Sequence, residues 1–381
     1  MILWNPIGRP VVPTMLFALA STVALIAAWS PSLPEPRLLP TPEQPSADGH
    51  AFYQTRQIPR PAGAAMVHAS SLAALPNGDR LAWWYGGSGE LAADVAIYQA
   101  RFRNDAWEMA QPIATPEMVG RAEQRLIRRL GNPVAHRDAS GRLRLFFVSV
   151  TIGGWATSSI HQMVSDDDGA RWSAPQVIVT SPLLNLSTLV RHPPLPLADG
   201  GFLLPVYHEL ARYCPEVLRF DAHGCLVGKT RMPGTGACQP SLVAVNASEA
   251  VAHLRDTQTQ RHCVLLQQTH DGGLTWSPPR CLDVPNPNAP VATGRLPDGT
   301  WLMVCNPLSF HRQCLLLARS TDGVDWRPVK MLEQAASEYV EFSYPALLVD
   351  GDRIDITYSW RRDHIQHVRF NRAWLKGQSD G

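Results

Sequence analysis

Charged side chains are scarce in this sequence of 381 residues, and neither sign dominates. Asp, Glu, Lys and Arg together make up 18% of the chain, where about a quarter is usual. The 34 basic residues are balanced by 33 acidic ones, which leaves a formal net charge of +1. Because nothing points to a basic surface, we expect no nucleic-acid partner.

Several motifs of enzyme chemistry are also missing. The seven Cys and 13 His show no spacing typical of zinc ligands. No glycine-rich loop follows a strand as it does in nucleotide-binding proteins, and there is no serine nucleophile elbow. We therefore expect a protein that works without a metal ion or an organic cofactor.

Hydrophobic residues, in contrast, make up 45% of the chain, which is enough for a large core. Residues 11–29 form an uncharged apolar run that is just long enough to span a bilayer as a helix. We expect an uncleaved signal anchor, with a cleaved signal peptide as the alternative. Either way, the positive-inside rule predicts an inner-membrane-anchored protein with its main domain in the periplasm, or secretion to the periplasm. Residues 30–50 are rich in proline, so we expect an extended linker that takes no part in a core.

Clusters of turn-forming residues recur along the rest of the chain, at intervals of about fifty to sixty residues. These clusters are LPNGD at 75–79, DASGR at 138–142, ADGG at 198–201, NASE at 246–249, PDGT at 297–300 and DGD at 350–352.

A second marker, S-x-D-x-G-x-x-W, lies in another phase of the same repeat. Residues 165–172 fit it fully, residues 269–276 fit with Thr for Ser, and residues 320–326 are one position shorter. The sequences NDAW at 104–107 and DAHG at 221–224 are weaker versions. We expect the Asp of each box to accept backbone N–H bonds and the Trp to pack between strands, so that these residues hold the fold together and are not catalysts.

Apolar, β-rich runs flank the turns and predict strands. These runs are LRLFFVSV at 143–150, GFLLPVY at 201–207, TWLMVC at 300–305, CLLLARS at 314–320 and RIDITYSW at 353–360. A repeat of about fifty residues with four short strands is typical of a propeller blade. We therefore predict an all-β, six-bladed β-propeller over residues 51–375, after a signal segment (1–29) and the linker (30–50), with a tail at 376–381.

The boxes on a six-fold repeat resemble the Asp-box (BNR) repeats of the sialidase superfamily, and other segments resemble bacterial sialidase-like BNR proteins. These segments are HASSLAALPNGD, GGSGELAADVAIY, GNPV, CQPS, VPNPNAP, EFSYPALLVDGD and YSWRRDHIQHV. The resemblance implies a site in which three arginines hold a substrate carboxylate, a glutamate polarises a tyrosine nucleophile, and an aspartate is the acid/base. In this chain, Arg255 in AHLRD and Arg312 in FHRQCLLLARSTDG match two arginines, and Tyr344 in SYPALL matches the nucleophile.

Two positions depart from the family pattern. His68 stands where the first arginine is expected, and Gln239 stands where the glutamate is expected. Gln239 cannot act as a base, whereas His68 can bind a carboxylate when protonated or carry a proton near neutral pH. The acid/base position falls on Glu90 or Asp94.

Other polar residues allow both a structural and a functional role. His208, in YHE at a strand end, is a candidate for the mouth of the propeller. Asn132 in GNPV and Asn286 in PNPN either hold turns or bind substrate. Arg361, with Arg362 and His364, forms a cationic cluster that is either solvated or substrate-binding.

All seven Cys lie between residues 214 and 314. Cys263 and Cys281 are symmetric about an Asp-box turn, and Cys305 and Cys314 about another turn, so each pair is expected to face across a hairpin. Outside the cytoplasm such pairs can oxidise, and otherwise they are buried as small apolar side chains.

Three functions fit these features. The preferred one is a sialidase-like glycoside hydrolase, of the exo-α-sialidase type, for an acidic sugar or an envelope polysaccharide or exopolysaccharide. Arg255 and Arg312 would hold the sugar carboxylate, and Tyr344 would be nucleophile or proton carrier; Arg312→Ala should then weaken binding far more than Arg362→Ala. The alternatives are a uronate polysaccharide lyase, with His68 or Tyr344 as base, and a non-catalytic glycan-binding propeller in polysaccharide assembly or export, which Gln239 favours. We expect a monomer.

Overall fold

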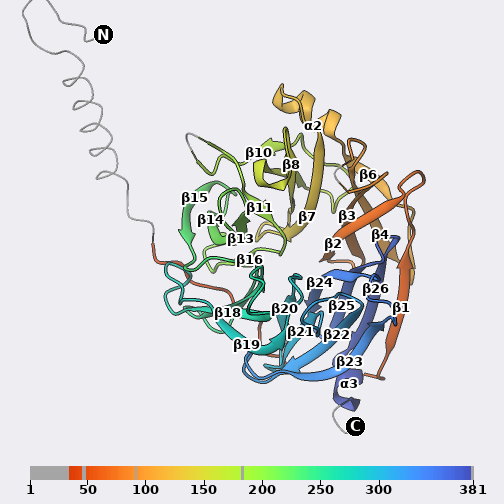
Figure 1. Cartoon of the computed structure of the whole chain (residues 1–381), viewed down its shortest axis with the longest axis vertical. Helices are drawn as coiled ribbons and strands as arrows, with labels where there is room; N and C mark the ends of the chain where they lie inside the picture. The colour runs from red at the N-terminus through yellow and green to blue at the C-terminus, as the bar shows by residue number, and fades with distance from the viewer. Residues whose placement is uncertain (1–33, 45–48, 91, 182–183, 379–381) are drawn as a thin grey trace, which may run out of the picture. The chain divides into compact units, whose positions relative to one another are not determined.

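The computed structural model describes residues 34–44, 49–90, 92–181 and 184–378, and residues from Pro36 onward form one compact unit. This unit consists of six antiparallel sheets that follow one another around a common centre in chain order (Figure 1). The predicted six-bladed all-β propeller is confirmed. Helices are few, with α2 (Pro116–Glu123) between the first two blades and α3 (Arg372–Gly377) after the last.

Each blade runs from an inner strand outward. Blade 1 holds β2 (Met66–Ala74), β3 (Arg80–Gly87), β4 (Ala96–Arg103), β5 (Ala106–Trp107) and β6 (Gln111–Ala114). Blade 2 holds β7 (Arg129–Arg137), β8 (Leu143–Val150), β9 (Ser158–Ser165) and β10 (Gln176–Val177). Blade 3 holds β11 (Leu189–Val190) and β12 (Leu195–Pro196) as a broken inner strand, then β13 (Phe202–His208), β14 (Cys214–Phe220) and β15 (Leu226–Arg231).

The second half of the ring repeats this pattern. Blade 4 holds β16 (Ala237–Ala244), β17 (Ala250–Asp256), β18 (Cys263–Thr269) and β19 (Arg280–Pro285). Blade 5 holds β20 (Ala292–Arg295), β21 (Trp301–Cys305), β22 (Cys314–Ser320) and β23 (Arg327–Gln334). Blade 6 holds β24 (Phe342–Asp350), β25 (Arg353–Trp360), β26 (His364–Asn371) and, as its outer strand, β1 (Tyr53–Ile58).

The ring is closed by strands from both ends of the propeller. β1 pairs with β26 from Tyr53 opposite Phe370 to Ile58 opposite Ile365, so orange β1 lies beside blue β26 in Figure 1. A buried ion pair reinforces the same seam, because Arg80 on β3 donates to Asp355 on β25 at 2.8 Å. The first strand of the propeller thus completes the last blade as its fourth strand.

The six recurrent turns connect the first and second strands of all six blades, and the Asp boxes follow the third strands. In the box of blade 4, Thr269 Oγ1 accepts from the Gly273 N–H at 3.0 Å and Asp271 Oδ1 from the Thr275 N–H at 2.9 Å. The boxes at 165–172 and 320–326 form the same bonds. The predicted structural role of the boxes is confirmed.

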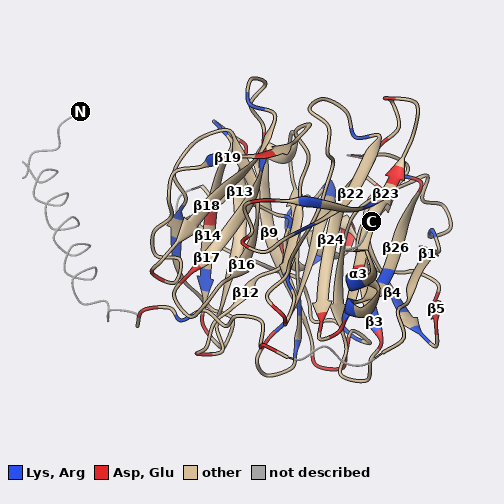
Figure 2. Cartoon of the chain, turned by 90° about the horizontal axis from the view of Figure 1, so that it is seen from below, with Lys and Arg blue, Asp and Glu red and all other residues tan. Residues whose placement is uncertain are grey.

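Strand direction separates the two ends of every blade. Because Ala250 at the start of β17 pairs with Thr269 at the end of β18, the box and the recurrent turn share one end, which we call the turn end. Asp and Glu gather at several of these turns, along the lower edge of the propeller in Figure 2. The opposite end, where inner strands begin and second strands finish, is called the site end.

The proline-rich linker departs from prediction where the structure describes it. Leu38 is 1% exposed and packs against Leu195, Leu197 and Trp276. Its N–H donates to the carbonyl of Ala247 at 2.8 Å. The expectation that this segment takes no part in a core is therefore wrong at Leu38, because an extended chain can still bury a single side chain between two blades. The predicted boundary at 375 also falls inside α3, which ends at Gly377.

The predicted signal segment, 11–29, lies outside the described residues. Within the described part of the chain, no helix is both long and apolar enough to cross a membrane.

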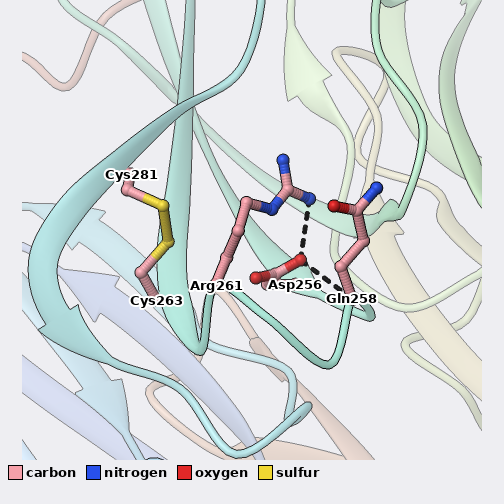
Figure 3. The surroundings of a disulfide bond; sticks show 5 residues. All are labelled: Asp256, Gln258, Arg261, Cys263 and Cys281. Carbon is pink, nitrogen blue, oxygen red and sulfur yellow. Dashed lines mark hydrogen bonds and ion pairs between the residues drawn. A yellow bond between two sulfur atoms is a disulfide. The ribbon is translucent and has the colours of Figure 1, made fainter.

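Of the two cysteine pairs, one is oxidised. Cys263 and Cys281 form a disulfide between β18 and β19, with Cα atoms 5.6 Å apart (Figure 3). Cys305 and Cys314 are free and buried.

Candidate functional site

The inner strands share a backbone irregularity at the site end. The strand register shifts just after His68, Gly131, Cys238 and Ser343, and the next residue in each strand has a positive φ. These next residues are Ala69 (55°), Asn132 (44°), Gln239 (54°) and Tyr344 (55°). A β-bulge re-aims a side chain, and positive φ in non-glycine residues is a strain typical of functional sites. Three of the four residues precede a proline, so one local pattern recurs in three blades.

Tyr344 lies at the centre of the resulting cluster. Its hydroxyl accepts a hydrogen bond from Arg255 Nη1 at 3.3 Å. The His68 ring is centred 4.2 Å from the Tyr344 ring, and the guanidinium carbons of Arg191 and Arg312 lie 5.3 and 5.9 Å from its centroid. Tyr344 is half-buried, so a ligand from the site end can approach it.

Arg255 is held by neutral groups. Its Nε donates to Asn288 Oδ1 at 2.6 Å, and its Nη1 donates to Gln239 Oε1 at 3.2 Å as well as to Tyr344. Among the described residues, Arg255 forms no salt bridge. A half-buried guanidinium without a carboxylate partner is well suited to an anionic ligand.

Arg312 approaches the same point from blade 5. Its Nη2 donates to the main-chain oxygen of Asn288, whose side chain holds Arg255. Its Nη1 forms a 2.8 Å salt bridge with Glu341. The two arginines predicted to share a carboxylate thus bind the same residue, one through its side chain and one through its backbone.

Glu341 organises the neighbouring positive charges. It accepts from Arg312, from Arg362 Nε at 3.0 Å, and from the Ser343 hydroxyl. Burial favours the neutral form of Glu341, but the positive charges of Arg312 and Arg362 and the hydrogen bond from Ser343 outweigh this and lower its pKa to about 2. Arg362 also pairs with Glu90 on the loop after β3. Of the two roles that the sequence left open for Arg362, simple solvation does not describe it, because two carboxylates hold its guanidinium group.

His68 is enclosed under these groups. It is 1% exposed, and neither ring nitrogen has a hydrogen-bond partner within the described structure. Burial, followed by the positive charge of Arg362, lowers its pKa well below the usual value. At neutral pH the imidazole is uncharged, so His68 cannot replace the missing arginine as a cation.

The inner wall of the cluster is built from neutral hydrogen bonds. The Tyr207 hydroxyl accepts from Gln239 Nε2 at 3.2 Å and from Asn132 Nδ2 at 3.4 Å. Burial raises the pKa of Tyr207 and of nearby Tyr85 well above the usual range, so both stay protonated. Gln239 therefore lies inside the cluster, and so does Asn132, for which the sequence left a turn role and a substrate-binding role open.

Arg191 is a buried cation behind Tyr344. Its Nη1 and Nη2 donate to the main-chain oxygens of Ser70 and Pro345, at 3.1 and 2.7 Å, which ties three blades together at the axis. Burial lowers its pKa to about 10, so it remains charged. Arg191 is thus the second guanidinium group next to Tyr344 that has no carboxylate partner among the described residues.

Other predicted residues lie apart from the cluster or have structural partners. Asp94 accepts from the Ser88 N–H and hydroxyl, which closes its own loop. The His208 ring lies between Ser187 O and Glu216. Asn286 is fully buried and bonds Ala289 in both directions, which holds a turn. Arg361 stacks on Trp360, 4.8 Å from the ring centroid.

Sequence reasoning missed Arg191 and Glu341 as parts of this cluster, whereas Tyr207, in YHE, and Arg362 belonged to segments that it left open as candidates. Arg191 carries no motif, and only convergence of the strands brings it inside. Glu341 sits three residues before Tyr344 in EFSYP, and Arg362 follows the end of β25, so proximity to quoted motifs was the available signal. A further acidic residue, Glu209, lies near Arg255, and burial raises its pKa.

The charge balance favours an anion over a metal ion. The cluster holds the guanidinium groups of Arg191, Arg255, Arg312 and Arg362, and within the described structure only those of Arg312 and Arg362 form ion pairs with carboxylates. Across the described residues, no three His, Cys, Asp or Glu side chains are close enough together to hold a metal ion. The cluster can bind a carboxylate beside a tyrosine hydroxyl.

Comparison with protein families gives a direct match. The model of the BNR repeat-like domain matches residues 78–356, which is most of the propeller and contains Arg255, Arg312 and Tyr344. The chain belongs to the BNR repeat-like domain family. No curated protein matches the chain in sequence.

Solved structures share the fold of this BNR repeat-like protein at low identity. Hadza microbial sialidase Hz136 is 16% identical with a TM-score of 0.67, over 80% of this chain and 65% of that one. A protein of unknown function from Dyadobacter fermentans is 13% identical with a TM-score of 0.67, over 83% and 99%. NanB sialidase from Streptococcus pneumoniae is 10% identical with a TM-score of 0.66, over 89% and 71%. The chain thus spans about two thirds of the first sialidase, and these likenesses establish the sialidase-like propeller fold.

Proposed function

We propose that this protein is a sialidase-like glycoside hydrolase that binds an acidic sugar at the site end. The observation that carries the proposal is Arg255, a half-buried cation without a carboxylate partner among the described residues, beside Tyr344. Because Arg255 and Arg312 converge on Asn288, a carboxylate that displaces Asn288 could accept from both. The sialidases with this fold are consistent with such a substrate.

In this proposal Tyr344 is the nucleophile. Its oxygen forms a bond to the anomeric carbon and loses its phenolic proton to solvent water, while the glycosidic C–O bond breaks and the departing oxygen takes a proton from a carboxylic acid. Water then attacks the anomeric carbon and gives a proton back to that carboxylate. The bond to the tyrosine oxygen breaks, and this oxygen regains a proton from solvent. Glu90 and Glu209 are the candidate acids, and the raised pKa of Glu209 suits a proton donor better than an ion-paired carboxylate does.

One observation favours a second candidate, a glycan-binding propeller without turnover. Gln239 stands where the family resemblance places the glutamate that polarises the tyrosine, and its amide is bonded to Arg255 and Tyr207. An amide cannot take a proton from Tyr344. Such a site would still bind the sugar carboxylate.

Product analysis tests the proposal. The purified protein is incubated with sialylated and uronate-containing glycans, and the products are separated by chromatography. Release of a free acidic sugar, abolished by Tyr344→Phe without loss of binding, supports the hydrolase. An unsaturated uronide absorbance would indicate the lyase instead, and binding without any product would indicate the second candidate.

We also propose that the protein works in the periplasm as a monomer, tethered to the inner membrane by its N-terminal segment. The apolar run at 11–29 and the Cys263–Cys281 disulfide both support an oxidising compartment outside the cytoplasm. Fractionation after a high-salt wash tests this: the anchored form stays with the membranes, and a cleaved form appears in the soluble periplasmic fraction.

A further inference from the structure

The site end of blades 2 and 3 exposes a set of large apolar side chains, which we call the apolar rim. Their exposed fractions are well above those of a core: Leu126 61%, Ile152 71%, Leu184 69%, Leu186 36%, Leu210 57% and Tyr213 38%. Single exposed apolar residues are ordinary, but a group around a candidate site marks an interaction surface.

Hydrogen bonds hold the loops of the apolar rim side by side. Arg125 Nη2 donates to Thr151 Oγ1 at 2.8 Å, which joins the loop of Leu126 to that of Ile152. Ser159 Oγ donates to Asn185 O at 2.7 Å, which joins the end of the Ile152 loop to the Leu184 and Leu186 loop. The Leu210 N–H donates to Ser187 Oγ at 2.8 Å, which extends the series to blade 3.

Two of the four loops that carry the rim are aliphatic and uncharged, whereas the loops of Leu126 and Leu210 also hold Arg125, Arg128, Glu209 and Arg212. Residues 151–157 read TIGGWAT, and residues 178–188 read IVTSPLLNLST, with no charged side chain in either. Sites for sugar rings are typically aromatic faces with hydrogen-bonding groups, whereas Leu and Ile offer only apolar contact. An alkyl chain is the ligand group that matches such a surface best.

The apolar rim is continuous with the candidate site. The main-chain oxygen of Tyr213 accepts from the Gly236 N–H at 2.9 Å, directly before β16, the strand that carries Gln239. On the other side, the Trp155 ring is centred 6.2 Å from that of Tyr85, and it packs so closely over Gly131 that an added Cβ would come within 2.4 Å of it. A ligand whose carboxylate lies at Arg255 therefore has the rim beside it.

We infer that the apolar rim binds an aliphatic aglycone, so that the substrate is an amphiphile whose acidic sugar occupies the cluster around Tyr344. This inference rests on the proposed function, because it places the sugar carboxylate at Arg255 and Arg312. It narrows the substrate class from acidic glycans to acidic sugars that carry an alkyl or lipid chain.

The test compares two glycosides of one acidic sugar, differing only in the aglycone. Binding of the methyl and octyl glycosides of sialic acid and of glucuronic acid to the full-length protein is measured by calorimetry, below the micelle concentration. Since each buried methylene improves binding about fourfold, the octyl glycoside should bind at least tenfold more tightly than the methyl one. The double variant Ile152→Ser/Leu184→Ser should lose this preference and bind the methyl glycoside as wild type does.

Leu274→Ser is the matched control, because Leu274 is 44% exposed in an Asp box at the turn end. It should keep the full preference for the octyl glycoside. If both glycosides bind equally, or the rim variant keeps the preference, the aglycone inference is wrong while the proposed function stands. If neither glycoside binds, the proposed function fails and the inference with it. If wild type sediments as a dimer that the rim variant abolishes, the rim is an interface between copies and the inference is overturned.

Discussion

Gln239 shows how one side chain can decide between chemistry and binding. Its amide donates to Tyr207 and accepts from Arg255, so it fixes the wall of the site and the clamp at once. A carboxylate at this position would keep the bond to Arg255 and add a charge that polarises Tyr344. With Gln239 in place, the proposed site therefore lacks the proton acceptor that a carboxylate would supply at this position.

Gln239→Glu is predicted to raise kcat on an aryl glycoside of an acidic sugar by about tenfold or more, since a positioned base contributes at least that much. KM should rise as well, because the new carboxylate competes with the substrate for Arg255. Steady-state kinetics measure both. Gln239→Met, which has a similar volume without polar groups, should lower kcat, and an unchanged kcat in the Glu variant would argue against Tyr344 as nucleophile.

The residues found from sequence and those that were missed differ in a physical way. The resemblance to sialidase segments, and not a local physical pattern, pointed to His68, Gln239, Arg255, Arg312 and Tyr344. Arg191 and Glu341 gained their roles from burial and from partners on other blades, which no local pattern encodes.

At the scale of elements, the second and third strands were the easiest to predict. Their apolar runs are continuous because both faces are buried between blades, and the runs at 314–320 and 353–360 coincide with β22 and β25. The inner strands were harder, since bulges and polar site residues interrupt their pattern. The recurring pair of a polar or aromatic residue followed by proline, as in Asn132-Pro133, is the signal that would have identified them.

The buried part of the linker should contribute to stability. Leu38→Ala is predicted to lower the free energy of unfolding by about 2–4 kcal/mol, because it removes a fully buried leucine from between blades 3 and 4. Leu39→Ala is the control, as its side chain is 53% exposed and should cost little. Chemical denaturation measures both, and equal effects would show that Leu38 is not a core residue in solution.

The disulfide braces an element of the site. Cys263 follows the 257–262 loop, in which Asp256 Oδ1 accepts from Arg261 at 2.8 Å and from the Gln258 N–H at 3.0 Å (Figure 3). Cys281 lies in β19, which leads to Asn288, and the Asn286 N–H donates to His262 O at 2.8 Å. The disulfide therefore links two segments, the 257–262 loop and β19, that both lead to the contact between Arg255 and Asn288.

Cys263→Ser/Cys281→Ser should destabilise the protein by about 2–4 kcal/mol, because the bond restricts the unfolded chain. A reductant should lower the melting temperature of wild type to that of the double variant and leave the variant unchanged. Differential scanning calorimetry with and without reductant makes the comparison. A wild type that ignores the reductant while both thiols are shown to be free would contradict the assignment.

At the scale of the whole molecule, the repeat explains why the fold was predictable. The same short sequence pattern marks the turn of every blade, and the Asp boxes repeat a second pattern. One unusual turn or box therefore does not change the predicted number of blades. The closure by β1 was not visible in the same way, because a single strand far from its partner in sequence has no repeat to mark it.

Buried neutral histidines should make the propeller sensitive to acid. Burial lowers the pKa of His136, His161 and His253 to about 4, and that of His68 and His192 further below the usual value. Below about pH 6.5 these histidines bind protons in the unfolded chain but stay neutral in the folded protein. The free energy of unfolding therefore falls as the pH drops. Glu341 and Asp355, with pKa values of about 2, add to the loss at lower pH.

We predict that the free energy of unfolding falls by about 2 kcal/mol or more between pH 7 and pH 5, since a tenfold difference in proton affinity is worth about 1.4 kcal/mol. Urea denaturation at several pH values measures the slope. His253→Gln should flatten it, whereas His270→Gln, at a largely exposed side chain, should not. A stability that is constant over this range would mean that the histidines are protonated inside the fold.

The most direct test of the carboxylate clamp is calorimetric titration of an acidic sugar into wild type, Arg255→Ala, Arg312→Ala and Arg353→Ala. Arg353 is an exposed arginine at the turn end and serves as the control. Because a hydrogen bond to a charged group contributes about 1.5–3 kcal/mol, each site variant should bind roughly tenfold to a hundredfold more weakly, and the control should bind as wild type does. If all four proteins bind the sugar equally, the carboxylate is not held by Arg255 and Arg312, and only the propeller fold remains of the proposed site.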